Sequence, residues 1–283
     1  MRINTFKISA LLMLLTAITL NANAGWPMGK KHYMISTTFT HYQASKGWEK
    51  NGQFGSLNGD FMSQSAGLYV DYGVSRTLDF IVSLPFSYQT IKNEFGTFHQ
   101  SGAGDLQLGF STVLKNFKYT NYITLYVGAS APLYKNTDIR VLGMGNAGIV
   151  ARVSASGLLK KGVFYNIDLG GGQYFGVAAP IQGTASGFIG FSVSDYNQIN
   201  IGADGVYSSS SDKTFNPNII AAKDFWYSRV SAGFSHSFSR RFTLNLGGFY
   251  TVAGRNTGQG YGASVTASMK LPYFGKSHKE ALE

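Results

Sequence analysis

The last stretch of the chain, residues 260–274, alternates between two kinds of residue with a period of two. Odd positions from Tyr261 to Tyr273 are apolar or aromatic, and even positions from Gly262 to Pro272 are small or polar with one lysine. A strand in a soluble protein is usually about 5–6 residues long, whereas one that crosses a bilayer at a tilt needs about 9–11. The pattern therefore predicts the closing strand of a transmembrane barrel.

The same alternation recurs along the chain, with long polar segments and short turns between the repeats in regular succession. It predicts an all-β fold, a transmembrane antiparallel up-and-down β-barrel of about 12 strands, with ten or fourteen strands as alternatives. Pro85 lies within the third strand, where a bulge is expected. The predicted strands are residues 32–43, 62–73, 77–90, 103–114, 122–133, 147–157, 163–174, 182–193, 198–208, 226–238, 242–252 and 260–274.

The N-terminal segment has the features of a secretory signal. Arg2 and Lys7 precede an apolar stretch at residues 8–20, and the small residues Ala22-Asn23-Ala24 follow it. We expect a cleaved signal peptide at residues 1–24, a short periplasmic lead from Gly25 to Lys31 and a barrel that ends at residue 274. Residues 275–283 are expected to be a polar periplasmic tail.

Composition supports the same class of protein. Of 283 residues, 13% are charged, compared with about 25% in soluble domains, while 14% are aromatic and 35 are glycine. The chain has no cysteine, so a disulfide framework or thiolate metal site is excluded. The formal net charge is +10, and many of the basic residues lie on predicted periplasmic turns, which favours contact with lipid phosphates over nucleic acid.

Charged residues within the predicted strands lie almost entirely on the side opposite the apolar one. Because arginine or lysine facing lipid costs about 2–4 kcal/mol at mid-bilayer, this side is expected to face the lumen. Two interpretations are open: the charges brace the lumen, or they form a polar constriction that filters solutes. These candidate residues are Asp71, Asp79, Asp105, Arg152, Asp168, Asp204, Arg229 and Lys270.

The turn positions suggest which charges meet across a hairpin. A turn centred near position 160 places Arg152 opposite Asp168, and this predicts a cross-strand ion pair. Asp204 and Arg229 are expected to pair below an outer loop in the same way.

A further turn, centred near position 75, places Asp71 opposite Asp79. Two facing carboxylates are unfavourable unless a cation intervenes, and Lys270 is the candidate for that role. A barrel of twelve strands lies between the filled interior of eight and the open channel of sixteen, so a narrow lumen is expected. Inward aromatic side chains either line a path for solutes or plug it: Tyr42, Tyr69, Tyr126, Phe164 and Phe249.

Several short motifs resemble one known family. They are Gly25-Trp26-Pro27-Met28-Gly29-Lys30, residues 70–78 (VDYGVSRTL), Leu84-Pro85-Phe86, residues 104–109 (GDLQLG) and residues 254–258 (GRNTG). In these the chain resembles the outer-membrane β-barrel transporter family of the phenol-degradation MetA-pathway type. The resemblance implies a transporter of hydrophobic or aromatic compounds, and members beside exopolysaccharide synthesis systems keep a secretion role open. It supplies no catalytic residues.

The sequence therefore predicts passive passage of small solutes, hydrophobic or aromatic ones included, through a narrow polar lumen in the bacterial outer membrane. The expected partners are outer-membrane lipid, lipopolysaccharide, a small-molecule solute and the barrel-assembly machinery, with no nucleic acid. The alternatives are a structural or adhesive barrel acting through loops 44–61 and 209–225, an accessory to exopolysaccharide export, and an outer-membrane hydrolase.

A hydrolase is the least favoured of these alternatives. His236 has no outward-facing serine beside it, His41 stands alone, and His99 has only Glu94 and Asp105 near it for an acid–histidine cluster. The five histidines show no metal-ligand spacing. The triple glycine at residues 170–172 lies inside a strand pattern and not before a helix, so it does not predict a phosphate-binding loop. We expect no enzymatic activity, cofactor or metal.

Overall fold

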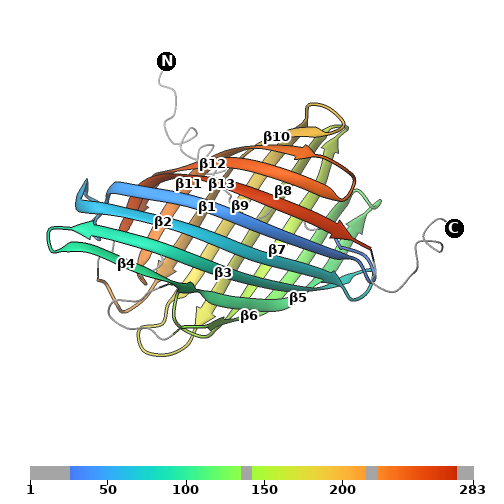
Figure 1. Ribbon diagram of the computed structural model, residues 1–283. Coiled ribbons are helices and arrows are strands. Elements are labelled where there is room, and N and C mark those ends of the chain that lie inside the picture. Colours follow the sequence, from blue (N-terminus) through green and yellow to red (C-terminus); the bar gives the residue numbers. More distant parts are fainter. Residues whose placement is uncertain (1–25, 135–141, 215–221, 273–283) are drawn as a thin grey trace, which may run out of the picture.

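The chain forms a closed, all-β barrel in the computed structural model, which describes residues 26–134, 142–214 and 222–272 (Figure 1). Each strand pairs antiparallel with its neighbours, and β1 closes the ring by pairing with both β2 and β13. The strands are β1 (Tyr33–Trp48), β2 (Phe54–Gly73), β3 (Leu78–Asn93), β4 (Gly96–Ala103), β5 (Asp105–Phe117), β6 (Asn121–Pro132), β7 (Gly148–Lys160), β8 (Val163–Tyr174), β9 (Ile181–Ser192), β10 (Asn197–Ser209), β11 (Phe225–Ser237), β12 (Phe242–Arg255) and β13 (Thr257–Leu271).

The described strands make a wall twelve strands around. β4 and β5 follow one another across Gly104 and both pair with β3, so together they occupy one place in the wall. The predicted antiparallel up-and-down barrel of about 12 strands is confirmed. No helix long and apolar enough to cross a membrane occurs in the part of the chain that the structure describes.

The break between β4 and β5 accounts for Pro85. β3 itself is continuous through this residue, and Gly67 of β2 faces it in register. The carbonyl of Pro85 accepts a hydrogen bond from the Gly104 N–H at 2.8 Å, so the proline nitrogen faces the same side. Since proline lacks the N–H that a ladder needs, the irregularity falls in the neighbouring strand instead of in a bulge of β3.

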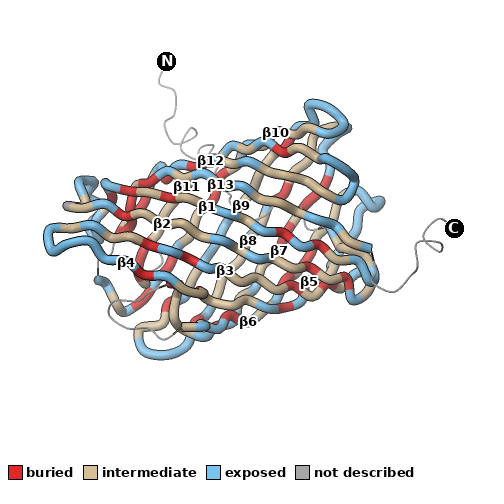
Figure 2. Tube along the Cα trace, in the orientation of Figure 1, coloured by how far each residue is buried: buried red, intermediate tan, exposed pale blue. Residues whose placement is uncertain are grey.

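The outward side of the wall is an apolar belt. Many predicted outward positions are exposed hydrophobic residues, whereas many inward positions are small, polar or buried. Figure 2 shows buried and exposed residues alternating along the wall. Such a belt is typical of a barrel whose outer face contacts lipid. Representative exposed residues are Ile35, Phe39, Leu68, Phe86, Leu108, Phe110, Val127, Ile149, Val153, Ile167, Leu169, Ile199, Ile201, Phe234, Leu246 and Val265.

The two ends of the barrel differ, and we name each by the strand ends that form it. The terminal rim is the end where β1 begins at Tyr33 and β13 ends at Leu271, and the hairpin rim is the opposite end. Figure 1 shows the β1–β2 and β3–β4 hairpins extending furthest at the hairpin rim. The sequence predicts the terminal rim to be periplasmic.

The structure corrects three predicted loops. Segments 44–61, 91–102 and 253–259 are mostly strand, because β1, β2, β3, β4, β12 and β13 all run into them. A polar composition predicts a loop, but a hairpin that projects into water keeps its backbone pairing without an apolar face. The register shifts at Ala44/Lys46, where a bulge lets the paired strands continue beyond the belt.

The residues before β1, predicted to be a short periplasmic lead, contact the interior of the barrel. Met28 and its neighbours line the interior at the terminal rim, where the Met28 N–H donates to the Asp79 carboxylate at 3.2 Å. The Lys31 N–H donates to the Gly73 carbonyl at 2.6 Å, and the Gly73 N–H donates to His32. These contacts fold the segment into the lumen.

Some sequence predictions lie outside the described residues. They are the signal peptide at residues 1–24, the last part of the closing strand at Tyr273 and Phe274, and the tail at residues 275–283. They stay predictions.

Candidate functional site in the lumen

A cavity of about 1000 Å³ occupies the lumen on the terminal-rim side. One wall of this cavity is a regular array of hydroxyl and amide side chains from β1, β13, β12 and β11, which we call the hydroxyl grid. Its rows, read across the strands, are Ser36, Ser268, Thr243 and Ser237, then Thr38, Thr266, Asn245 and Ser235, then Thr40 and Ser264 beside Gly247 and Gly233.

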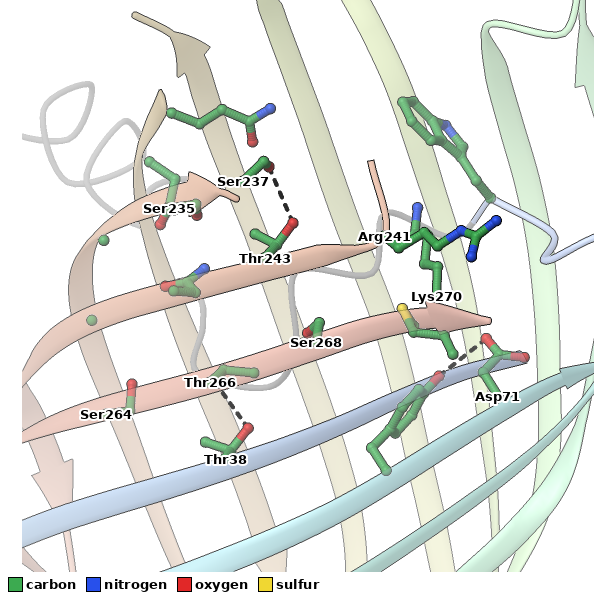
Figure 3. Close-up of a pocket in the computed structure, with 18 of the residues that line it drawn as sticks. Thr38, Asp71, Ser235, Ser237, Arg241, Thr243, Ser264, Thr266, Ser268 and Lys270 are labelled. Carbon is green, nitrogen blue, oxygen red and sulfur yellow. Dashed lines mark hydrogen bonds between the residues drawn. The ribbon is translucent and has the colours of Figure 1, made fainter. Parts of the chain in front are cut away.

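The grid follows from strand register combined with the inward parity. Small polar residues occupy every second position of four adjacent strands, and the register places them side by side. Neighbouring hydroxyls pair: Ser36 with Ser268 at 2.8 Å, and Thr38 with Thr266 at 2.9 Å. Figure 3 shows the second of these pairs, together with many of the other side chains of this wall. Each hydroxyl has both a donor and acceptor sites, so pairing leaves capacity for water or a solute.

Sequence reasoning missed the grid as a unit. Inward serines and glycines such as Ser264, Ser231 and Gly247 indicate a lumen without a solid core, but the chain order separates β1 from β13. The signal that identifies the array is hydroxyl residues at alternate positions on strands that meet at the seam of the barrel.

Two cations lie at the terminal-rim edge of the grid. Lys270 follows Ser268 at the next inward position of β13, and its backbone N–H donates to the Arg241 carbonyl at 2.8 Å. Both side chains line the cavity (Figure 3). Within the described ranges, no ion pair joins either of them to a carboxylate.

The prediction that Lys270 bridges Asp71 and Asp79 is therefore wrong. Lys270 and Asp71 lie at one level, since Met34 of β1 is in register with both, and the β1 strand separates them. Among the described residues, no ion pair joins Lys270 to Asp71 or Asp79. The buried Met34 lies between Lys270 and Asp71 at this level of the cavity.

Asp71 and Asp79 are also not opposite one another. Asp71 faces Ile81, and Asp79 faces Gly73. The turn is centred near position 76 instead of 75, so the residue opposite each strand position differs by two from the predicted one. The Ser75 hydroxyl accepts hydrogen bonds from the N–H groups of Thr77 and Leu78, the two residues that end the turn. One oxygen of each carboxylate has no hydrogen-bond partner, while Tyr69 donates to Asp71 at 3.5 Å.

Arg152 is likewise displaced from the position predicted for it. It faces Gly170, and Asp168 faces Ser154, yet the Arg152 Nε still lies 3.8 Å from an Asp168 oxygen. Asp168 also accepts hydrogen bonds from Ser154, from Asn166 at 2.6 Å and from Ser186 at 3.0 Å. The arginine side chain is 40% exposed and stacks over Tyr126, so its charge is only partly offset.

Asp204 and Arg229 lie directly opposite, as predicted, and form an ion pair. The Arg229 Nη2 and Nε donate to the carboxylate at 2.6 Å and 2.9 Å, a bidentate arrangement. The guanidinium also lies over the rings of Tyr227 and Phe249. The charge of Arg229 is therefore offset by Asp204 and covered by two aromatic rings.

An aromatic layer closes the cavity toward the hairpin rim. Tyr42 stacks on Phe249 with ring centroids 6.0 Å apart and an angle of 8°, and Phe61 packs against Tyr42. These side chains are buried and form a small apolar core inside the barrel with Ala44. Of the two predicted roles for inward aromatics, Tyr42 and Phe249 fit the one in which the side chains plug the lumen, and Phe61, which lies outside the predicted set, joins them.

Asp105 lies near the hairpin rim, away from the other charges. Its carboxylate accepts a hydrogen bond from the Met144 N–H at 2.6 Å, and Leu142 is buried beside it. The Met144 sulfur accepts a hydrogen bond from Gln182 of β9 at 3.3 Å. The segment from Leu142 to Asn146 therefore reaches from β5 across to β9 inside the mouth.

Asp224 fixes a second segment at this rim. Its buried carboxylate contacts Lys213 at 2.6 Å and Arg255 at 3.2 Å and accepts a hydrogen bond from Ser210 N–H. Burial alone raises the pKa of the Asp224 carboxyl, but the Lys213 and Ser210 hydrogen bonds and the Arg255 charge outweigh it and lower the pKa. The ionised carboxylate therefore holds the segment before β11 to the end of β12.

Two of the histidines weighed as catalytic candidates have hydrogen-bond partners in the wall of the barrel. His99 bonds to Tyr88 and Thr90 at 3.0 Å and 3.1 Å, and His236 bonds to Asn197 at 2.8 Å. Among the residues with a described placement, no group of three or more histidines and carboxylates has the geometry of a metal site. The expectation that the protein is not an enzyme stays a prediction.

Comparison with solved structures places this barrel among known folds. The chain is similar to the COG4313 outer membrane channel from Pseudomonas putida F1, with a TM-score of 0.73 and 14% identity over 89% of this chain and all of that one. It is also similar to the NanC porin, with a TM-score of 0.51 and 10% identity over 84% of this chain and all of that one. The fold that the sequence resemblance implies is therefore confirmed. No protein-family model matches the sequence, and no curated protein matches it.

Proposed function

We propose that this protein is an outer-membrane channel through which small solutes pass passively. The observation that carries the proposal is the polar cavity of about 1000 Å³, which is enclosed by the barrel wall and reaches the terminal rim. Side chains such as Asn245 and Ser264 line this cavity, and polar groups of this kind would lose their hydration inside a dry core, at a cost in free energy. A water-filled passage accounts for their number.

Similarity to solved structures also supports the proposal that the protein is a channel. Two of the solved structures that resemble this barrel are an outer membrane channel and a porin. The apolar belt suits outer-membrane lipid, and contact with lipopolysaccharide and the barrel-assembly machinery is expected on the same ground. Phe164 and Phe188, which meet edge to face at 5.9 Å, also line the cavity, so aromatic solutes remain within the proposed range.

Two narrow regions of the lumen limit which solutes can pass through the proposed channel. The aromatic layer of Tyr42, Phe61 and Phe249 lies on the hairpin-rim side of the cavity, and the Trp26–Met28 segment lies at the terminal rim. Arg152 is partly exposed and only partly offset by Asp168, so it is one of the inward charges able to select ions. The proposed channel is therefore narrow and charge-sensitive.

Conductance of the purified protein in planar bilayers tests the proposal. Steady single-channel current is expected, and Arg152→Gln should shift the ion selectivity toward cations. Lys92→Gln, on the β3–β4 hairpin, removes an equal charge outside the lumen and should leave selectivity unchanged. Absence of current, together with no solute-driven swelling of proteoliposomes, would contradict the channel.

A structural or adhesive role is the second candidate. The β3–β4 hairpin extends at the hairpin rim and exposes Phe95 and Phe98 to 81% and 45%. Exposed aromatics on a projecting hairpin are typical of contact surfaces. Unchanged adhesion of cells to surfaces after Phe95→Ser and Phe98→Ser substitution would remove this candidate.

A further inference from the structure

We propose that the hydroxyl grid and the Lys270–Arg241 pair form one binding surface for hydroxylated carboxylates, the class of the acidic monosaccharides. The inference rests on the proposed channel function and names the solute that the channel favours. It is carried by the arrangement of charge and hydroxyl groups on a single wall of the cavity (Figure 3).

The two cations are available to a solute. Lys270 and Arg241 line the cavity, and neither forms an ion pair within the described ranges. By contrast, Arg229 has a bidentate carboxylate partner and Arg255 contacts Asp224. Hydrogen bonds to charged groups are stronger than those between neutral groups, so these two cations favour an anionic group at this edge.

Asp71 gives the site a direction. It lines the same cavity at the level of Lys270, with Met34 of β1 between the two strands. One of its oxygens is buried without a hydrogen-bond partner. A solute carboxylate gains a cationic partner at Lys270 and Arg241 and none at Asp71, which orients the solute along the grid.

The hydroxyl groups continue from the cations at a regular interval. Along β13 the inward positions are Lys270, Ser268, Thr266 and Ser264, each about 7 Å from the last at the usual rise of a strand. Neighbouring strands place further hydroxyls about 5 Å to either side. A solute with its carboxylate at Lys270 therefore meets donors and acceptors within the length of one sugar ring.

The end of the grid toward the hairpin rim is flat as well as polar. Gly247 continues the row beside Ser264, and a Cβ at that position would lie 2.9 Å from the Ser264 hydroxyl. An apolar solute would strip water from this wall without replacing its hydrogen bonds, at a cost in free energy. A hydroxylated solute replaces them.

The flux of three solutes into proteoliposomes distinguishes the contribution of the two cations from that of the hydroxyl grid. Glucuronate carries both a carboxylate and hydroxyls, glucose carries hydroxyls only, and benzoate carries a carboxylate only. Glucuronate should permeate fastest through the wild-type protein. In the variant with Lys270→Gln and Arg241→Gln, its permeability should fall about tenfold toward that of glucose, since one charged hydrogen bond corresponds to at least that factor.

Two further variants complete the design. Thr266→Val with Ser268→Ala should slow glucuronate and glucose and leave benzoate unchanged. Lys160→Gln with Lys161→Gln removes two cations from a neighbouring turn of the terminal rim, outside the cavity lining, and should change none of the three rates. Folding of every variant is checked by circular dichroism and by the shift in gel mobility between unheated and heated samples.

The outcomes are distinguishable from failure of the channel itself. If steady current is present but glucuronate is no faster than glucose or benzoate, the inference is overturned and the channel stands. The same holds if the Lys160/Lys161 variant slows glucuronate as much as the Lys270/Arg241 variant. If no solute and no ion passes, the proposed function fails as well.

Discussion

The Asp204 carboxylate on β10 and the Arg229 guanidinium on β11 face one another in register and share a bidentate contact of 2.6 and 2.9 Å. The arginine side chain is 17% exposed, and the ring of Phe249 covers it. Removing one partner leaves a charge enclosed without compensation, whereas removing both does not. Comparing the single and double substitutions therefore tests whether this ion pair stabilises the barrel from inside the lumen.

Asp204→Ala should lower the free energy of unfolding by about 3–5 kcal/mol, because it leaves Arg229 unpaired. The double variant with Arg229→Ala should recover part of that loss. Urea unfolding in lipid vesicles, followed by tryptophan fluorescence, measures both. Asp195→Ala, at an exposed turn, is the control and should stay within about 0.5 kcal/mol of wild type. An equal loss in the control and in Asp204→Ala would contradict the bracing role.

The lowered pKa of Asp224 predicts an acid-dependent stability. Because the folded pKa is below the ordinary value of about 3.9, the ionised carboxylate stabilises the fold at neutral pH and loses that contribution as the pH falls through the folded pKa. Asp224→Asn should be less stable at pH 7 and should lose less on acidification. Melting temperature measured from pH 7 to pH 2 follows both variants.

Asp60→Asn is the control for the acid response, since Asp60 lies on the exposed part of β2. It should keep the wild-type decline in melting temperature at low pH. An Asp224→Asn variant that also keeps this decline would show that the acid sensitivity arises elsewhere in the barrel.

The contact between Met28 and Asp79 predicts that the N-terminal segment limits conductance. Asp79→Ala removes the acceptor of the Met28 N–H, a charged hydrogen bond of about 1.5–3 kcal/mol, so release of the segment should increase about tenfold or more. Single-channel recordings should show more frequent transitions to a larger conductance. Deletion of residues 26–28 should make the larger conductance permanent, and an unchanged conductance would refute the restriction.

The packing of the aromatic layer is expected to depend on the absence of a side chain at Gly262. A Cβ at this position would collide with the Phe249 ring and the His41 carbonyl. Gly262→Ala should therefore displace Phe249 from Tyr42 and lower stability by about 1–3 kcal/mol, the usual cost of overpacking. Thermal unfolding measures this cost, and conductance reports any widening of the lumen.

Gly248→Ala is the matched control for Gly262→Ala. Gly248 lies on the outward side of β12, and its nearest neighbour to an added Cβ is the Gly262 carbonyl at 3.9 Å, an ordinary contact. It should change neither stability nor conductance by a measurable amount. If both variants behave alike, the packing of Phe249 against Tyr42 does not depend on Gly262.

The sequence determined which way each side chain faces. A strand repeats every two residues, so shifting a turn centre by one residue changes each cross-strand partner by two and leaves the face unchanged. Arg152 and Asp79 illustrate this: both face inward as predicted, although the residues opposite them are Gly170 and Gly73. The barrel class, the strand number and the inward charges depend only on that period.

The tertiary structure decided what those inward residues form together. The hydroxyl grid requires β1 to lie beside β13, and the register that pairs Ser36 with Ser268 is set by closure of the barrel and not by any local turn. The insertion of Met28 beside Asp79 is a contact of the same long-range kind. Alternation along a strand is a local property that the sequence carries, whereas contacts between distant segments depend on how the whole wall closes.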